Sequence, residues 1–451
     1  MFHKVVIANR GTVAARLVRA LRVLGVKSAA LYSEADSDLP YVNEADEKYL
    51  IGPSPAPQSY LNQSAIIEAA VKCGGDAIHP GYGFLSENSA FAEKTAAAGL
   101  AFIGPDPKWL KVMGDKTACK ELMAQKGLPV SPSTGLLKGD AARQAEEAAA
   151  LGFPLLIKPA GGGGGIGMTP VFEKEKLTAA IESAAKLAAR SFSDASLYAE
   201  RLMENPRHVE FQIVADKNGR AVHLFERDCS TQRRRQKVVE EAGAPAMAAD
   251  QVKAMAERAA AVMSALGYDH LGTVETLYTP ETGFAFLEVN PRLQVEHGVT
   301  EEVAGVDLAA VQVRLAAGLP LSEAMPDRPD SISGHAVEAR IYAEDPVTFF
   351  PSPGRLKVFR PPRGTGLRVE TGFAEGAAVT PFYDPMIALL IVKAEAREKA
   401  LDLMYEALGD FAVEGVKTNI PFLRKLMRFT PFREGAVHTG LAEELLKATG
   451  E

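Results

Sequence analysis

Cysteine is scarce in this sequence, and its scarcity argues against two structural features that depend on it. The chain of 451 residues contains only 3 cysteines, Cys73, Cys119 and Cys229. Their odd number and the absence of a CxxC spacing argue against a disulfide framework and against a zinc site. A reducing, cytoplasmic setting fits such a pattern.

Long apolar runs and a surplus of basic residues are missing as well. No run approaches the roughly 20 apolar residues that a membrane-spanning helix needs. Residues 1–8 lack the charged head, long apolar stretch and cleavage site of a secretory signal, and are typical of a first strand. The net charge of −7 argues against general nucleic-acid binding, which needs a basic surface. We therefore expect neither a membrane nor a nucleic acid as a partner.

The composition, 47% hydrophobic and 24% charged, is that of a globular chain long enough for two or three domains. In the N-terminal region strand and helix patterns alternate, which predicts a parallel, doubly wound sheet. The predicted strands are residues 4–8, 27–32, 76–79 and 100–103, and the predicted helices are residues 14–24, 64–72 and 91–98. Gly11, Gly81 and Gly83 follow strand ends, where such sheets place loops that face ligands.

Two further regions depart from this pattern. Alanine-rich helices at residues 141–150 and 177–189 flank an apolar strand and five glycines at 161–165, which predicts a small α+β unit with a flexible loop. From His208 onward the pattern is that of antiparallel strands. The predicted elements there are a hairpin around Asn218-Gly219, a second hairpin at 272–290, strands at 333–342, 367–369 and 387–392, and two closing helices.

The glycine run extends to residue 167 and matches the GxGxxG pattern of dinucleotide sites. That interpretation requires a helix directly afterwards, whereas residues 168–172 are typical of a strand. No Gly-Lys-Ser/Thr closes the loop as in a Walker site. A glycine run between strands can instead fold its backbone N–H groups over phosphates, which Lys158 just upstream can also reach. A disordered linker is the alternative.

A candidate metal site lies on the second hairpin. Glu288 and Asn290 are two residues apart and therefore share one face of a strand, and Glu275 lies in the partner strand. Oxygen ligands of this kind suit Mg²⁺ or Mn²⁺ held together with phosphates. The alternative is a solvated outer face of the hairpin.

Polar residues continue directly after this hairpin. Arg292 can bind an oxyanion through its forked guanidinium, and Glu296 can act as a general base. The basic run at residues 226–237 indicates an anion site, although a charge run is more often a solvated face. Within that run we interpret Cys229 as a packing residue, because the sequence offers no obvious histidine partner for a nucleophile.

Several segments of the chain are similar to biotin carboxylase, and the similarity spans nearly the whole length. These segments are Ile7-Ala8-Asn9-Arg10-Gly11, residues 77–88, Met113-Gly114-Asp115-Lys116, residues 204–210, Arg227-Asp228-Cys229-Ser230, residues 236–241, residues 290–297 and Ala343-Glu344-Asp345-Pro346. The resemblance implies a three-domain ATP-grasp fold and ATP-dependent carboxylation of biotin with bicarbonate. It divides the chain into an N-terminal Rossmann-like domain (1–113), a lid region with the glycine flap (114–203) and a catalytic and C-terminal region (204–451).

The resemblance also implies roles for individual residues. ATP would contact Lys116, Lys158, His208, Gln232 and the flap glycines Gly162, Gly163, Gly164 and Gly165, with its adenine between the strand from Glu200 to Met203 and Leu277. Glu275, Glu288 and Asn290 would hold Mg²⁺ or Mn²⁺. Bicarbonate would be bound by Lys237, Arg292 and the backbone of Val295 and deprotonated by Glu296, while Arg340 would stabilise the biotin enolate.

These roles together describe one reaction. The deprotonated bicarbonate would attack the γ-phosphate of ATP, whose charge is neutralised by metal and lysines. The resulting carboxyphosphate would release CO₂ in a closed site that excludes water. The released phosphate would then take the N1 proton of biotin while Arg340 supports the developing oxyanion.

The resemblance further implies which proteins this chain works with. No Ala-Met-Lys-Met biotin-attachment sequence is found, so we expect a separate subunit that meets a carboxyltransferase and a biotin carboxyl carrier protein. We also expect a homodimer. The final carboxyl acceptor stays open, because its site would belong to another polypeptide.

The chain departs from the usual family pattern at Thr12, Ile166, Arg235, Gly243 and Leu389. Ile166 replaces a basic residue at the end of the glycine loop, and this change bears most directly on phosphate binding. Two alternatives therefore remain beside an active biotin carboxylase. One is an ATP-grasp ligase for another carboxylate, and the other is a nucleotide-binding paralogue with reduced turnover.

Overall fold

The N-terminal region forms a parallel sheet, as the alternation of strands and helices predicts. The computed structural model describes residues 1–161, 167–192 and 194–450. Its first sheet has five parallel strands in the order β3-β2-β1-β4-β5. The elements are β1 (Lys4–Ile7), α1 (Gly11–Val23), β2 (Lys27–Tyr32), η1 (Glu34–Asp36), α2 (Pro40–Glu44), β3 (Glu47–Leu50), η2 (Ala56–Gln58), α3 (Gln63–Lys72), β4 (Ala77–His79), α4 (Ser89–Ala97) and β5 (Ala101–Phe102).

Among the five strands of this sheet, only β3 was not predicted from the sequence. Its four residues, Glu47–Leu50, alternate between half-buried and exposed positions at the edge of the sheet. An edge strand with charged side chains lacks the continuous apolar run that marks the central strands of a parallel sheet. By contrast, β1 and β4, which pair with each other in the middle of the sheet, are almost wholly buried.

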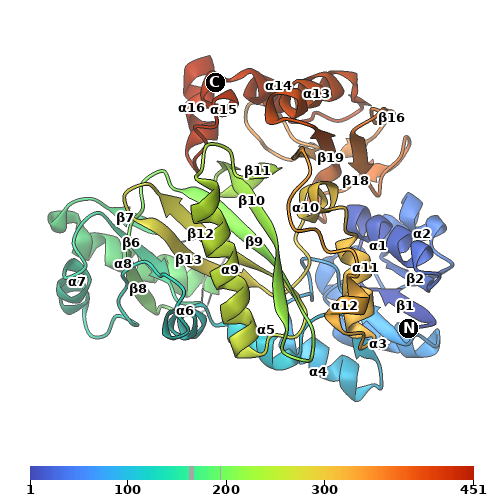
Figure 1. Ribbon diagram of the computed structural model, residues 1–451, viewed down its shortest axis with the longest axis horizontal. Helices are drawn as coiled ribbons and strands as arrows, with labels where there is room; N and C mark the ends of the chain where they lie inside the picture. The colour runs from blue at the N-terminus through green and yellow to red at the C-terminus, as the bar shows by residue number, and fades with distance from the viewer. Residues whose placement is uncertain (162–166, 193, 451) are drawn as a thin grey trace.

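Two helices lead from this sheet into a smaller region that projects from the body of the molecule (Figure 1). The helices are α5 (Pro107–Gly114) and α6 (Lys116–Gln125). The smaller region, which we call the lid, consists of α7 (Ala141–Ala149), β6 (Leu155–Pro159), β7 (Thr169–Val171), η3 (Lys174–Lys176), α8 (Leu177–Phe192) and β8 (Leu197–Arg201). Its strands pair antiparallel in the order β7-β6-β8, and apolar residues of α8 such as Ile181 pack against Leu155 and Ile157 of β6.

An antiparallel sheet of eight strands forms the centre of the molecule, in the order β13-β12-β9-β10-β11-β14-β19-β17. The strands are β9 (Arg207–Ala215), β10 (Ala221–Arg233), β11 (Gln236–Ala242), β12 (Leu271–Thr279), β13 (Gly283–Asn290), β14 (His335–Tyr342), β17 (Leu367–Glu370) and β19 (Met386–Ala394). Both predicted hairpins are present, β9–β10 around Asn218-Gly219 and β12–β13 around residues 280–282. The fold class expected from the sequence is therefore confirmed.

Helices cover the central sheet and close the chain (Figure 1). They are α9 (Ala249–Leu266), α10 (His297–Ala304), α11 (Leu308–Ala316), α12 (Leu321–Ala324), α13 (Arg397–Asp410), α14 (Ile420–Arg428), α15 (Thr430–Arg433) and α16 (Leu441–Thr449). Short ladders pair β15 (Gly354–Arg355) with β18 (Ala378–Val379) and β16 (Val358–Arg360) with β20 (Ala412–Glu414). The expectation of two closing helices is wrong, since α13 to α16 all follow the last long strand; Pro431 at the start of α15 separates it from α14.

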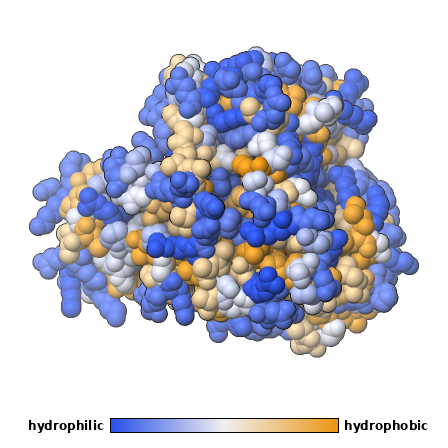
Figure 2. Space-filling model, in the orientation of Figure 1, coloured by the Kyte–Doolittle hydropathy of each residue, from blue (hydrophilic) through white to orange (hydrophobic). Residues whose placement is uncertain are grey.

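The surface of the molecule is mainly hydrophilic on the face that Figure 2 shows, with hydrophobic residues in scattered patches. The outline in Figure 2 is indented between the lid and the C-terminal helices. Across the described ranges, helices long and apolar enough to cross a bilayer are not found.

Candidate functional site

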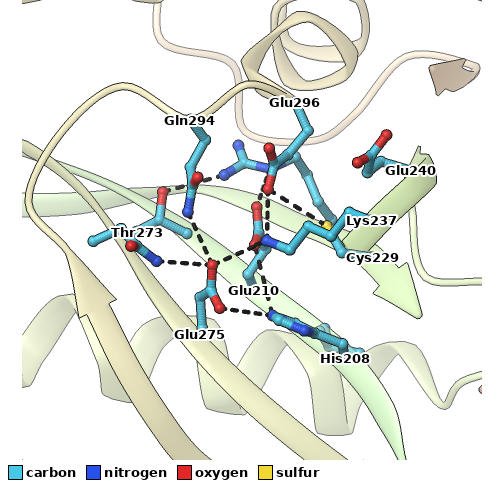
Figure 3. A network of polar contacts seen from close by, with 12 residues as sticks. His208, Glu210, Cys229, Lys237, Glu240, Thr273, Glu275, Gln294 and Glu296 are labelled. Carbon is cyan, nitrogen blue, oxygen red and sulfur yellow. Dashed lines mark hydrogen bonds and ion pairs between the residues drawn. The ribbon is translucent and has the colours of Figure 1, made fainter. Parts of the chain in front are cut away.

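The candidate site is organised around the ammonium group of Lys237 on β11. Its Nζ lies 2.6 Å from Glu210, 2.9 Å from Glu275 and 2.6 Å from Glu296. Figure 3 shows these three carboxylates converging on Lys237 from different directions. Three ionised carboxylates need more positive charge than one ammonium group supplies, and two arginine guanidinium groups contact the same carboxylates.

Strand register brings these residues together. Glu210 of β9 lies opposite Glu275 of β12, and alternation places His208 on the same face of β9 as Glu210. Arg227 of β10, itself opposite Glu210, donates to Glu210 Oε1 at 2.6 Å. Both side chains are completely buried, so each charge depends on its partner.

Glu296 lies between two cations in the loop that precedes α10. Its carboxylate accepts from Lys237 at 2.6 Å and from Arg340 of β14 at 2.9 Å, and the residue is only 1% exposed. Burial alone would raise the pKa of Glu296, but Lys237 and Arg340 outweigh burial and hold this pKa well below its usual range. Glu296 is therefore ionised near neutral pH, which is the state that a general base needs.

The three sequence-predicted metal ligands lie on neighbouring strands. Glu275 of β12 is directly opposite Glu288 of β13, and the Asn290 Nδ2 donates to Glu275 Oε1 at 2.8 Å. Glu288 is also 2.7 Å from the Lys116 ammonium. Two carboxylates and an amide oxygen form a donor set that fits Mg²⁺ or Mn²⁺, and the lysines beside them supply positive charge in the same place.

Arg292 connects these metal candidates to the N-terminal region. Its guanidinium donates to Asn290 Oδ1 at 3.0 Å, to Gln294 Oε1 at 2.8 Å and to Glu87 Oε1 at 2.5 Å. Glu87 lies just before α4, so this contact bridges two sheets of the molecule. The next backbone position, Val295, has its carbonyl oxygen 3.1 Å from the His297 ring.

Nucleotide-binding candidates gather between the central sheet and the lid. The Lys158 ammonium of β6 is 3.0 Å from Glu200 of β8, and His208 Nδ1 is 2.9 Å from Gln232 Nε2. Leu277 of β12 is opposite His208, and Met203 Sδ is 3.7 Å from the Ser131 hydroxyl. The predicted flap glycines Gly162, Gly163, Gly164 and Gly165, and the substituted Ile166, lie outside the described residues.

Sequence reasoning gave no role to Glu210, Glu240 or Glu87, which the structure places in contact with Lys237, Arg340 and Arg292. Burial outweighs the attraction of Arg340 and raises the pKa of Glu240 to about 7. The signal for Glu210 was available, because it follows His208 by two residues in an alternating strand and so shares its face. Glu240 and Glu87 gave no such signal, since their partners are distant in the sequence.

The basic residues of the run at 226–237 lie in different surroundings. Arg227 and Lys237 contact carboxylates of the centre, whereas Arg233 pairs with Glu344 and the Arg234 backbone N–H donates to Glu443 of α16. Cys229 is completely buried, and burial raises the pKa of its thiol well above the usual value. A thiol in that state is a poor nucleophile.

Two departures from the family pattern have a visible structural setting. Leu389 of β19 is buried directly opposite Arg340, so an apolar side chain lies in register with this candidate catalytic arginine. Gly243 has a φ of +89°, a conformation that proline cannot adopt.

Comparison with known proteins finds matches along nearly the whole chain. Family models match residues 1–110 (biotin carboxylase, N-terminal domain), 115–324 (carbamoyl-phosphate synthase L chain, ATP binding domain) and 338–444 (biotin carboxylase C-terminal domain). The chain is 47% identical over 446 residues to biotin carboxylase 2 of Bacillus subtilis, covering 99% of this chain and 100% of that protein. It is 46% identical over 447 residues to biotin carboxylase of Halalkalibacterium halodurans, covering 99% and 98% of the two chains.

Solved structures resemble the whole chain as well. The biotin carboxylase domain dimer of Hydrogenobacter thermophilus 2-oxoglutarate carboxylase, crystallised with MgADP, ADP and bicarbonate, has a TM-score of 0.93 at 41% identity and covers 98% of each chain. The complex of Campylobacter jejuni biotin carboxylase with β-γ-ATP has a TM-score of 0.93 at 39% identity, covering 98% of this chain and 99% of that one.

Proposed function

The chain belongs to the biotin carboxylase family, and we propose that the buried cluster around Lys237 and Glu296 is the place where it activates bicarbonate. As an ATP-grasp ligase of this family it carboxylates biotin with bicarbonate and ATP, through carboxyphosphate. The observation that carries the proposed site is Glu296, a buried carboxylate kept ionised by Lys237 on one side and Arg340 on the other.

Bicarbonate binding follows from the cations in this cluster. Lys237 and Arg292 present an ammonium and a guanidinium within the region that Glu296 faces, and the backbone of Val295 adjoins them. Their present partners are carboxylates and an amide, so bicarbonate would take over contacts that Glu210 and Asn290 now make. Held there, bicarbonate gives its proton to Glu296 and becomes a nucleophile for the γ-phosphate of ATP.

The nucleotide side supplies the electrostatic partner for that attack. Lys116 and Lys158 would turn to the phosphates of ATP, with His208, Gln232 and Leu277 around the nucleoside and the strand from Glu200 to Met203 at its edge. Glu275, Glu288 and Asn290 would hold Mg²⁺, or Mn²⁺ in its place, which neutralises phosphate charge when bound.

Arg340 is proposed to act in the second step. It lies between Glu240 and Glu296, at 2.7 Å and 2.9 Å. A guanidinium with such partners is firmly oriented, and it would stabilise the negative charge that develops on the ureido oxygen of biotin. The inorganic phosphate released from carboxyphosphate would accept the N1 proton.

We further propose the setting in which the chain works. It would meet a carboxyltransferase subunit and a biotin carboxyl carrier protein. The dimeric Hydrogenobacter relative supports a homodimer. Three buried cysteines without disulfide bonds support a reducing, cytoplasmic compartment. The final carboxyl acceptor differs among the relatives, which include pyruvate carboxylase and methylcrotonoyl-CoA carboxylase chains.

One assay tests the proposed function directly. ADP release is measured with free biotin and with bicarbonate, and then with each of them omitted. Release that requires both substrates is expected. Release that depends on a different carboxylate would indicate another ATP-grasp ligase, and ATP binding without any release would indicate a paralogue that has lost turnover.

A further inference from the structure

Glu200 lies between two buried lysines, and only one of them has a role in the proposed function. Lys120 Nζ of α6 is 2.7 Å from Glu200 Oε1, and Lys158 Nζ of β6 is 3.0 Å from Glu200 Oε2. The side chains of Lys120, Glu200 and Lys158 are 11%, 13% and 13% exposed, so water screens their charges only weakly. Lys158 is assigned to the phosphates of ATP, whereas Lys120 has no assignment.

Helix α6 determines where Lys120 points. The helix begins at Lys116, and the Asp115 side chain caps it by accepting from the Ala118 N–H at 3.0 Å. Lys116 and Lys120 are four residues apart and therefore share one face of the helix. The first reaches Glu288 on the central sheet and the second reaches Glu200 on the lid, so α6 connects the two sides of the nucleotide site (Figure 1).

Together these three groups carry a net charge of +1, because two lysines share one carboxylate. Burial lowers the pKa of Lys120 despite the nearby Glu200, whereas for Lys158 the attraction of Glu200 outweighs burial and raises the pKa. The two lysines outweigh burial at Glu200 and lower the pKa of its carboxyl group. Two cations thus share the Glu200 carboxylate. If one of them moves away, the carboxylate stays paired with the other.

We infer that Lys120 is a positioning residue that keeps Glu200 paired while Lys158 turns from Glu200 to the nucleotide phosphates. This inference rests on the proposed function, which assigns Lys158 to those phosphates. A buried carboxylate that loses its only partner is strongly destabilised. With Lys120 present, Glu200 retains one cation throughout. Without Lys120, ATP that binds Lys158 must break the one ion pair that Glu200 would still make among the described residues.

The first test replaces Lys120 by methionine, which preserves the length of the side chain and removes its charge. We expect Lys120→Met to weaken ATP binding about 10-fold or more, because Lys158 is then held by Glu200 without competition. The Kd for ATP and the KM for ATP should both rise, while kcat at saturating ATP changes much less. Lys120→Arg should restore affinity, and Lys126→Met, at the exposed C-cap that follows the same helix, should leave it unchanged.

A double variant distinguishes this role from a merely structural one. In the Glu200→Gln background there is no carboxylate that could lose its ion pairs, so adding Lys120→Met should alter the Kd for ATP by less than about 2-fold. An equal loss of ATP affinity in both backgrounds would overturn the inference, as would wild-type affinity in Lys120→Met alone. Thermal denaturation of each variant verifies that it is folded.

The readout also separates this inference from the proposed function. ATP binding is measured without biotin or bicarbonate, so the lysine test remains valid if the wild-type chain shows no biotin-dependent turnover. Turnover that requires biotin and bicarbonate, together with an unchanged Kd in Lys120→Met, would support the proposed function and reject the role of Lys120.

Discussion

The two charged clusters of this molecule are opposites in composition. At the Lys237 centre one ammonium group contacts three carboxylates, Glu210, Glu275 and Glu296. At the lid two ammonium groups share the single carboxylate of Glu200. Carboxylates gathered around one lysine favour metal ions and the uptake of protons, whereas two lysines around one carboxylate favour phosphates. The difference indicates which half of the reaction each cluster serves.

The clusters also differ in how firmly they are built into the fold. Arg227, the second cation of the Lys237 centre, contacts Glu210, Gln212, Thr273 and Thr300 and has no exposed surface. The Lys120, Glu200 and Lys158 side chains at the lid are 11%, 13% and 13% exposed. Their second ammonium group allows the carboxylate to change partners while it stays paired. We therefore expect substitutions at the first cluster to affect chemistry and folding, and those at the second to affect mainly nucleotide affinity.

The largest expected effect comes from removing the carboxylate that faces both Lys237 and Arg340. Glu296→Gln preserves the size of the side chain but cannot accept a proton from bicarbonate. Bicarbonate-dependent ADP release should fall by about 10²- to 10⁴-fold, the usual contribution of a general base. Steady-state kinetics measure this loss, and equilibrium binding should give an ATP affinity close to that of the wild type.

Glu281→Gln provides the matched control for this substitution. Glu281 is exposed in the turn between β12 and β13, on the same hairpin as the metal candidates. Its turnover should equal that of the wild type. Wild-type turnover in Glu296→Gln would instead remove Glu296 from the mechanism and leave the Lys237 cluster with a structural role only.

The next effect in size concerns stability. Arg227→Met removes a fully buried cation and leaves Lys237 as the lysine or arginine that pairs with Glu210 among the described residues. Breaking a buried ion pair in this way costs about 3–5 kcal/mol. Thermal denaturation should show a large fall in Tm. Arg220→Met, at an exposed position on the same β9–β10 hairpin, should change the Tm little. Equal Tm values for the two variants would show that the buried network does not stabilise the fold.

Sequence patterns predicted contacts within one hairpin better than contacts between distant parts of the chain. Alternation within β12 and β13 placed Glu275, Glu288 and Asn290 together, because a hairpin fixes the register of its two strands. The contacts of Lys237 with Glu296 and of Arg340 with Glu240 join distant parts of the chain. They depend on the order β9-β10-β11-β14 in the central sheet, which no local pattern specifies.

The lid illustrates the same limit. An apolar run predicted the strand that carries Lys158, and the resemblance to biotin carboxylase gave that lysine its role. Lys120 looks like an ordinary helix-surface residue in the sequence, since nothing near it indicates a buried partner. Its contact with Glu200 arises only when α6 packs beside the lid. Side chains that act through another residue are thus the ones that sequence reasoning misses.

The smallest effect concerns a second pair of acids beside the Lys237 centre. Glu338 of β14 is directly opposite Glu240 of β11, and both are completely buried. Neither oxygen of Glu338 has a hydrogen-bond partner among the described residues. Burial and the Glu240 carboxylate raise the pKa of Glu338 well above its usual value of about 4.5. Folded protein therefore retains a proton on Glu338 that the unfolded chain releases above that pH.

The difference in proton binding between the folded and unfolded states determines how the stability changes with pH. Stability falls with rising pH wherever the folded state binds more protons than the unfolded state, so Glu338 destabilises the wild type increasingly above pH 4.5 or so. Glu338→Gln removes this term and should raise the Tm, by more at about pH 8 than at about pH 5. Glu406→Gln, exposed on α13, should change the Tm little at either pH. A Tm difference that does not depend on pH would mean that Glu338 is ionised in the folded protein, and the centre would then carry one more negative charge.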